Sequence, residues 1–369
     1  MNSAGHIPSL NGLRAGAVLI VFVGHGLTLP PAWPGHVGVT IFFFLSGFLI
    51  TTLLRREHAE HGRISLKRFY LRRAFRILPP AYVTIALAVL IGAIGLLPSS
   101  TSGWGILAEV FNYTNYYLVF AGRQGLPPET SMLWSLSVEE HFYLVFPIAM
   151  IALLARKLSI RRIGYILIVA VCVAPIWRII LQVSGAEFYH LYTGSDTRFD
   201  GLLAGAAMAL LANPTMGDRA PWGLSDRTIN KVLFPLALFI FAASTVATRD
   251  AVRLTIIDTF QFACLAVVFW HVITRPEGLV GRILNNRWVA HIGVLSFSIY
   301  LLHRLVIALV ARVVEISPAV DLISLAMTIA LAQLMYVAVE RPSTRLRKRL
   351  EKRLPTPRQY HSDRTASGA

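Results

Sequence analysis

The chain has 369 residues, of which 55% are hydrophobic and only 15% are charged, and its mean hydropathy is +0.59. A soluble globular domain carries about a quarter charged residues, so this composition excludes a soluble protein. An aromatic content of 11% also excludes a disordered chain. The composition therefore predicts a polytopic membrane protein.

Apolar stretches recur along the whole length, and each approaches the roughly 20 residues that a helix needs to cross a bilayer. These stretches are too long and too uniformly apolar for barrel strands, so we expect an all-α transmembrane bundle. The ten predicted spans lie at residues 15–31, 37–54, 77–97, 132–155, 163–184, 198–212, 231–248, 254–274, 291–313 and 319–339.

Positive charge is distributed unevenly between alternate loops. The chain holds 35 Lys and Arg against 19 Asp and Glu, a formal net charge of +16. Of these cations, 27 lie in the loops on one side and in the C-terminal tail, whereas the opposite loops hold only three. This bias predicts cytoplasmic termini in a multi-pass protein of the cell's inner (cytoplasmic) membrane. The basic charge then faces anionic lipid, so we expect the bilayer, and no nucleic acid, as a partner.

Neither a disulfide framework nor a metal site is expected. Cys172 and Cys264 both lie inside apolar spans, and no set of residues has the spacing of metal ligands. We expect one transmembrane domain over residues 1–342 and a basic, flexible cytoplasmic tail over residues 343–369. The pattern predicts no particular oligomeric state.

Ionisable residues inside apolar spans are the candidate functional residues, because they are costly at membrane depth and usually line a cavity. Arg14 and His25 in the first span are eleven residues apart, within about 20° of three full helical turns. On a helix both would project from one face, roughly 16 Å apart along the axis. The alternative is that Arg14 extends to the inner interface and that His25 is a packing residue.

Two further arginines, Arg73 and Arg76, share a helical face at the inner mouth of the third span. A fixed pair of guanidinium groups suits phosphate. The alternative is that both residues only set the orientation of the span.

Adjacent carboxylates, Glu139 and Glu140, lie near the start of the fourth span. Neighbouring helical residues point about 100° apart, so one of the two should face the bundle. There it would orient His25 as a general base. Alternatively, both carboxylates are interface residues that the helix N-terminus stabilises.

Three later groups complete the candidates. Asp196 and Asp200 share a face at the outer start of the sixth span, and Arg198 between them is a candidate to neutralise them. His303 lies in the ninth span, and Glu340 lies at the inner end of the tenth.

Together these motifs resemble acyltransferase family 3, a family of integral membrane acyltransferases. The motifs occur in one order over residues 10–342, nearly the whole chain. They are LNGLRA at residues 10–15 followed by His25, residues 38–48, Arg73 with Arg76, WSLSVEE at residues 134–140, residues 196–200 and YLLH at residues 300–303.

The resemblance implies ten transmembrane helices and transfer of an acyl group, usually acetyl from cytoplasmic acetyl-CoA, to a hydroxyl. The implied acceptor is a cell-surface glycan, a lipid-linked sugar or a secreted glycosylated molecule. In the family an Arg and a His of the first helix are required, and these match Arg14 and His25, while the paired arginines of the third helix match Arg73 and Arg76. The acidic residue before proline in the last helix matches Glu340, to which we assign a structural or gating role. Many relatives append a hydrolase-like domain; we expect none here, and we therefore expect direct transfer.

The geometry of the motifs offers a reason for this pattern. Phosphates cannot cross lipid, so we expect acyl-CoA to keep its head beside Arg14, Arg73 and Arg76 while its thioester meets His25 as general base. No metal is required, whereas a covalent acyl-His or acyl-Tyr intermediate stays open. We assign the acceptor to the later polar groups, Asp196, Arg198, Asp200 and His303.

The alternative class is a polytopic transporter or flippase of a glycan or lipid-linked substrate, with the buried charges lining its pathway. Such transporters often show two related halves with broken helices at matching positions, and the charged spans lack that correspondence.

Overall fold

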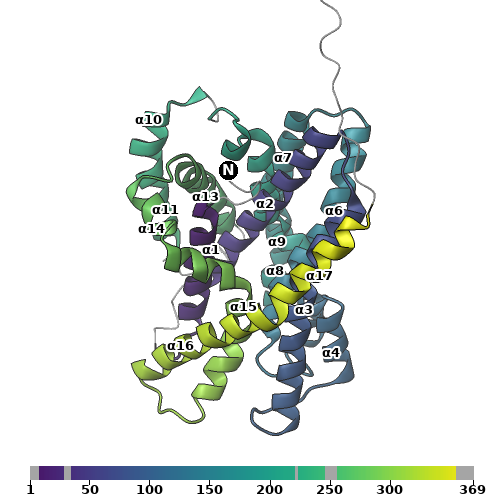
Figure 1. Ribbon diagram of the computed structural model, residues 1–369, viewed down its shortest axis with the longest axis vertical. Coiled ribbons are helices and arrows are strands. Elements are labelled where there is room, and N and C mark those ends of the chain that lie inside the picture. The colour runs from purple at the N-terminus through teal and green to yellow at the C-terminus, as the bar shows by residue number, and fades with distance from the viewer. Residues whose placement is uncertain (1–7, 29–34, 221–222, 246–255, 355–369) are drawn as a thin grey trace, which may run out of the picture.

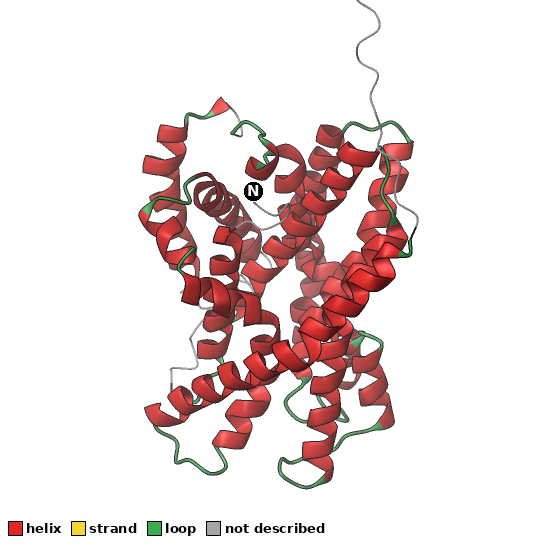
Figure 2. Cartoon of the chain, viewed as in Figure 1, coloured by secondary structure: helices red, strands yellow, loops and turns green. Residues whose placement is uncertain are grey.

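The computed structural model describes residues 8–28, 35–220, 223–245 and 256–354, and in these ranges every element of regular secondary structure is a helix (Figures 1 and 2). The prediction of an all-α bundle is confirmed, because each of the ten predicted spans corresponds to a helix. Those helices are α1 (Pro8–Gly24), α2 (His36–His61), α3 (Leu66–Ala93), α6 (Trp134–Ala155), α7 (Ile160–Val183), α9 (Ser195–Leu211), α11 (Phe234–Thr245), α13 (Asp258–Thr274), α15 (Arg287–Val310) and α16 (Pro318–Met335).

Seven helical segments of the described chain are long and apolar enough to cross a membrane. Parts of three predicted spans, residues 29–31, 246–248 and 254–255, lie outside the described ranges. The bundle has two ends, which we name by the short helices that they carry. The α4 end carries α4 (Gly103–Val110), α5 (Thr114–Ala121) and the link between α15 and α16, and the α10 end carries α10 (Asp226–Thr228) (Figure 1). The α4 end is the side that the charge bias predicts to face outward.

Helix α9 forms the centre of the bundle, between α2 and α7. Thirteen of its 17 residues are buried, and six of these are Ala or Gly. A Cβ atom on Gly205 would lie 1.9 Å from the carbonyl oxygen of Phe44, so only glycine allows α2 and α9 to pack backbone against backbone. The sixth predicted span is therefore enclosed by protein.

Helix α1 is held tightly at both ends. A Cβ atom on Gly293 would lie 1.9 Å from the carbonyl oxygen of Asn11, so α1 and α15 meet closely beside Arg14. Beyond the other end of α1, Asp321 accepts hydrogen bonds from the amides of Leu27 (2.9 Å) and Thr28 (3.1 Å) and from the Thr28 hydroxyl. These contacts fix the segment that carries His25.

The start of the expected flexible tail is helical. A turn with i→i+5 hydrogen bonding (Tyr336–Glu340) joins α16 to α17 (Arg341–Lys352), which packs against α3. Arg72 of α3 forms an ion pair with Glu351 at 3.1 Å. Residues 343–354 are thus part of the bundle, and residues 355–369 lie outside the described ranges.

Candidate active site

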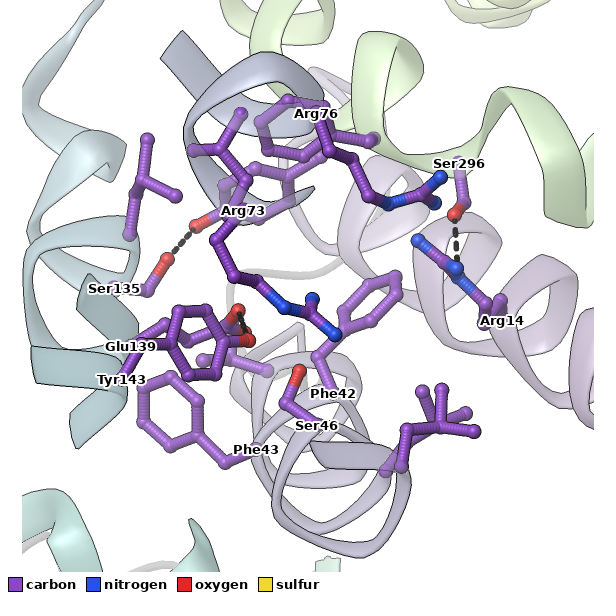
Figure 3. A pocket seen from close by; sticks show the side chains of 17 residues that line it. Arg14, Phe42, Phe43, Ser46, Arg73, Arg76, Ser135, Glu139, Tyr143 and Ser296 are labelled. Carbon is purple, nitrogen blue, oxygen red and sulfur yellow. Dashed lines mark hydrogen bonds between the residues drawn. The ribbon is translucent and has the colours of Figure 1, made fainter. Parts of the chain in front are cut away.

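A cavity of about 90 Å³ lies between α1, α2, α3, α6 and α15. Its walls bring together three of the predicted site residues, Arg14, Arg73 and Arg76, from two helices that are distant in sequence. Figure 3 shows their three guanidinium groups pointing into this one space. The sequence prediction that these arginines form one group agrees with this placement.

The three arginines have few partners on the protein. Arg14 Nε donates to Ser296 Oγ at 3.2 Å. The Arg73 guanidinium lies 5.1 Å from the ring centre of Tyr143, which is cation–π distance. Across the described ranges, none of the three forms an ion pair. The cavity therefore presents positive charge that the described chain leaves unpaired.

Glu139 lines the same cavity, where its Oε2 accepts a hydrogen bond from Tyr143 at 2.6 Å (Figure 3). Glu140 does not line the cavity, and its buried Oε1 has no hydrogen-bond partner among the described residues. With one carboxylate facing three guanidinium groups, the walls carry an excess of positive charge. No cluster that could hold a metal ion occurs within the ranges that the structure describes.

His25 is oriented by a partner other than the expected carboxylates. It follows the last residue of α1, and its Nδ1 lies 2.9 Å from the Val21 carbonyl oxygen and 3.3 Å from His303 Nε2. The two imidazole rings are 4.9 Å apart between centroids. The expectation that Glu139 or Glu140 orients His25 is thus replaced by a histidine pair.

The contacts of this pair assign its tautomers. His303 Nδ1 lies 2.6 Å from the Tyr300 carbonyl oxygen, which can only accept, so His303 carries its hydrogen on Nδ1. Its Nε2 is then an acceptor facing His25 Nδ1, and the Val21 oxygen also requires a hydrogen on that atom. The lone pair of His25 therefore lies on Nε2, where it is available to take a proton.

Tyr300 separates the arginine cavity from the histidine pair. Its side chain lines the cavity, and its ring lies 5.6 Å from the ring of His303. Its hydroxyl lies 2.6 Å from Ser135 Oγ and donates to the Met132 carbonyl at 3.0 Å. Sequence reasoning did not single out Ser135 and Tyr300, although both belong to the quoted motifs.

The expected acidic cluster on α9 is divided between different partners. Arg198 pairs with Asp258 of α13, and Asp200 pairs with Arg178 of α7 at 2.5 Å, all within the buried core. Among the described residues Arg198 forms its ion pair with Asp258 and not with Asp196 or Asp200, which corrects the expectation that it pairs on its own helix. Arg178 and Asp258 were missed, although an ionisable residue inside an apolar span was the available signal.

Asp196 lies apart from this core at the surface. It accepts from Trp177 Nε1 at 2.9 Å and lies 3.1 Å from His190 Nε2. The structure therefore places the four predicted acceptor-binding residues at three separate positions, with His303 beside His25.

Glu340 connects the end of α16 to α15. Its buried carboxylate accepts a hydrogen bond from Ser298 Oγ at 2.6 Å, and it closes the i→i+5 turn. Ser298 lies two residues beyond Ser296, the partner of Arg14. This contact is compatible with the structural role that we assigned to Glu340.

Comparison with known proteins gives a consistent result. The acyltransferase domain family matches residues 7–337. The chain is 29% identical over 356 residues to the peptidoglycan O-acetyltransferase OatA of Listeria monocytogenes, an alignment that covers 92% of the chain and 56% of that protein. It is 30% identical over 357 residues to a putative O-acetyltransferase of Staphylococcus aureus (91% and 57%) and 30% identical over 349 residues to the putative peptidoglycan O-acetyltransferase YrhL of Bacillus subtilis (91% and 55%).

The chain thus spans slightly more than half the length of these curated relatives. No solved structure matches the chain. Since the family match extends over most of the ten-helix bundle and includes every arginine of the cavity and both histidines, the chain belongs to the acyltransferase 3 family.

Proposed function

We propose that the protein transfers an acetyl group from acetyl-CoA to a hydroxyl of a cell-wall glycan. The observation that carries the donor is the arginine cavity, where three guanidinium groups face one carboxylate. Grouping like charges with few partners is costly, and a ligand with several phosphates supplies the missing negative charge. The acceptor class rests on the relatives whose names specify peptidoglycan.

His25 is the general base in this proposal. Its Nε2 takes the proton from the acceptor hydroxyl while the hydroxyl oxygen attacks the thioester carbonyl carbon. The carbon–sulfur bond breaks as the ester forms, and the departing thiolate takes the proton from the His25 imidazolium. The reaction then yields the acetyl ester and free CoA, and His25 returns to its starting state.

His303, Tyr300 and Ser135 have supporting roles in this proposal. His303 holds the hydrogen of His25 on Nδ1 and so keeps Nε2 free as the base. In this proposal the acetyl group must pass Tyr300, which stands between the cavity and His303. The hydrogen bond between Tyr300 and Ser135 then limits access of the thioester to His25.

The test is acetyl transfer by the purified protein in lipid nanodiscs, with radiolabelled acetyl-CoA and soluble peptidoglycan fragments. His25→Ala should lower transfer at least a hundred-fold while leaving expression and membrane insertion unchanged, because it removes the base and little packing volume. His61→Ala, at the end of α2, is the matched control and should keep full activity.

Two results would contradict the proposal. Activity of His25→Ala above a tenth of the wild-type value would exclude His25 as the base. Wild-type protein that binds the fragments and leaves the thioester intact would instead indicate a transporter.

A further inference from the structure

An ion pair between Arg304 and Glu129 lies close to the two histidines, at the α4 end. Arg304 follows His303 on α15, and adjacent helical residues point about 100° apart. His303 therefore faces His25, while Arg304 faces Glu129 in the segment between α5 and α6. The charges of Arg304, Glu129 and Arg123 all act on the His25 ring.

The pair leaves one carboxylate oxygen unused. Arg304 donates to Glu129 Oε2 from both Nε (2.8 Å) and Nη2 (2.5 Å). Oε1 of Glu129 makes no hydrogen bond to the part of the chain that the structure describes. The two side chains are 27% and 31% exposed, so the pair is accessible to a ligand.

The backbone at Glu129 is strained, because its φ is +59°, a left-handed value that glycine or asparagine adopts more readily. A residue kept in this conformation against its preference is a reason to look for a function of its side chain. Here the side chain is a carboxylate placed beside a histidine pair.

A buried contact behind the segment holds this conformation. The Thr130 hydroxyl donates to the Pro127 carbonyl at 2.7 Å and also contacts Glu109. The single hydroxyl hydrogen is shared between these two acceptors, the Pro127 carbonyl and the Glu109 carboxyl. Burial raises the pKa of Glu109 to about 8, although the hydrogen bond from Thr130 opposes the shift.

We propose that Glu129 and Arg304 bind the acceptor, as a subsite for the hydroxyl groups of a sugar ring next to His25; this rests on the proposed function. A sugar hydroxyl both donates and accepts, so it suits a free carboxylate oxygen beside a guanidinium group. The pair itself is neutral, unlike the arginine cavity, so it selects a polar ring over a polyphosphate.

The experiment compares the KM for soluble peptidoglycan fragments with the KM for acetyl-CoA in the nanodisc assay. Glu129→Gln should raise the fragment KM at least ten-fold and leave the acetyl-CoA KM within two-fold. Glu315→Gln, an exposed carboxylate in the link between α15 and α16, is the matched control and should change neither value.

A second variant separates binding from folding. Glu129→Gly relieves the backbone strain, so it should unfold at no lower a temperature than wild type and still lose acceptor affinity. An unchanged fragment KM in both variants, with active wild-type protein, would overturn the subsite and leave the proposed function standing. Wild-type protein that acetylates no fragment would overturn the proposed function itself.

Discussion

Two regions of the bundle hold clustered arginines in opposite ways. Between α7, α9 and α13, Arg178 and Arg198 are almost completely buried, and each forms an ion pair with an aspartate. In the cavity beside α1, Arg14 and Arg73 are half-buried, and neither forms an ion pair within the described ranges. The first cluster is electrically balanced, and the second is not.

The difference indicates which arginines serve the fold and which serve a ligand. A balanced pair needs nothing from outside, and removing one partner leaves an uncompensated buried charge. A group of unpaired cations facing a cavity is tolerated only when it is partly solvated, and a bound anion stabilises it most. We therefore expect substitutions in the two clusters to have opposite effects on stability and on activity.

The largest effect is expected in the balanced cluster. Arg178→Ala leaves Asp200 buried without its cation, so it should lower the free energy of unfolding by about 3–5 kcal/mol. The measurement is the yield of folded protein in detergent, together with its thermal unfolding midpoint.

A paired substitution supplies the control. In Arg178→Met combined with Asp200→Leu, both charges are absent, and the double variant should recover most of the lost stability. Equal instability of the single and double variants would show that this cluster is more than a balanced ion pair.

The second prediction concerns the unbalanced cluster, and it tests the donor. Arg14→Ala should leave the unfolding midpoint near the wild-type value and should lower kcat/KM for acetyl-CoA ten-fold or more, because a contact with a charged group contributes about 1.5–3 kcal/mol. Arg56→Ala, outside the cavity on α2, is the control and should not change kcat/KM.

A thioester of dephospho-CoA tests for a direct contact. If Arg14 binds the missing phosphate, wild type should prefer acetyl-CoA and the Arg14→Ala variant should not. The same loss of preference in Arg73→Ala or Arg76→Ala would assign that phosphate to those residues. Additive effects in all three variants would exclude contact between these arginines and the phosphate that dephospho-CoA lacks.

The sequence predicted the helices well and the pairing of side chains poorly. Apolar length alone places a helix in each of the ten predicted spans, and helical spacing places Arg73 beside Arg76. The first helix begins seven residues before the predicted start and ends one residue before His25, which we expected inside it. Arg14 joins the two other arginines because α15 packs against both α1 and α3, and Gly293 allows the close contact with α1. Periodicity does not encode these contacts. Local pattern thus predicted the members of the cavity but not the contact that assembles it.

The predicted partners of His25 and of the charged residues on α9 were wrong for the same reason. A helical pattern gives the face of a side chain, whereas its partner depends on which helices are neighbours in space. Glu139 was expected at His25, but α15 brings His303 there instead. Arg198 was expected to pair on its own helix, but α13 supplies Asp258.

Glu109 sharpens the comparison, because it is a buried ionisable group that pairs with no cation among the described residues and whose raised pKa favours the protonated, neutral form. Its pKa of about 8 in the folded protein lies above the ordinary value of 4.5. Between these pH values the folded state holds a proton that the unfolded state releases. The contribution of this proton to the free energy of unfolding is therefore complete below pH 4.5 and is lost as the pH rises through about 8. Between these values the free energy of unfolding should fall by about 1.4 kcal/mol per pH unit. Glu109→Gln stays neutral, so the difference between the unfolding midpoints of variant and wild type should grow from pH 6 to pH 7 and level off above about pH 8. The exposed Glu315→Gln should show no such growth, and parallel curves for Glu109→Gln and wild type would mean that the Glu109 carboxylate is charged in the folded protein.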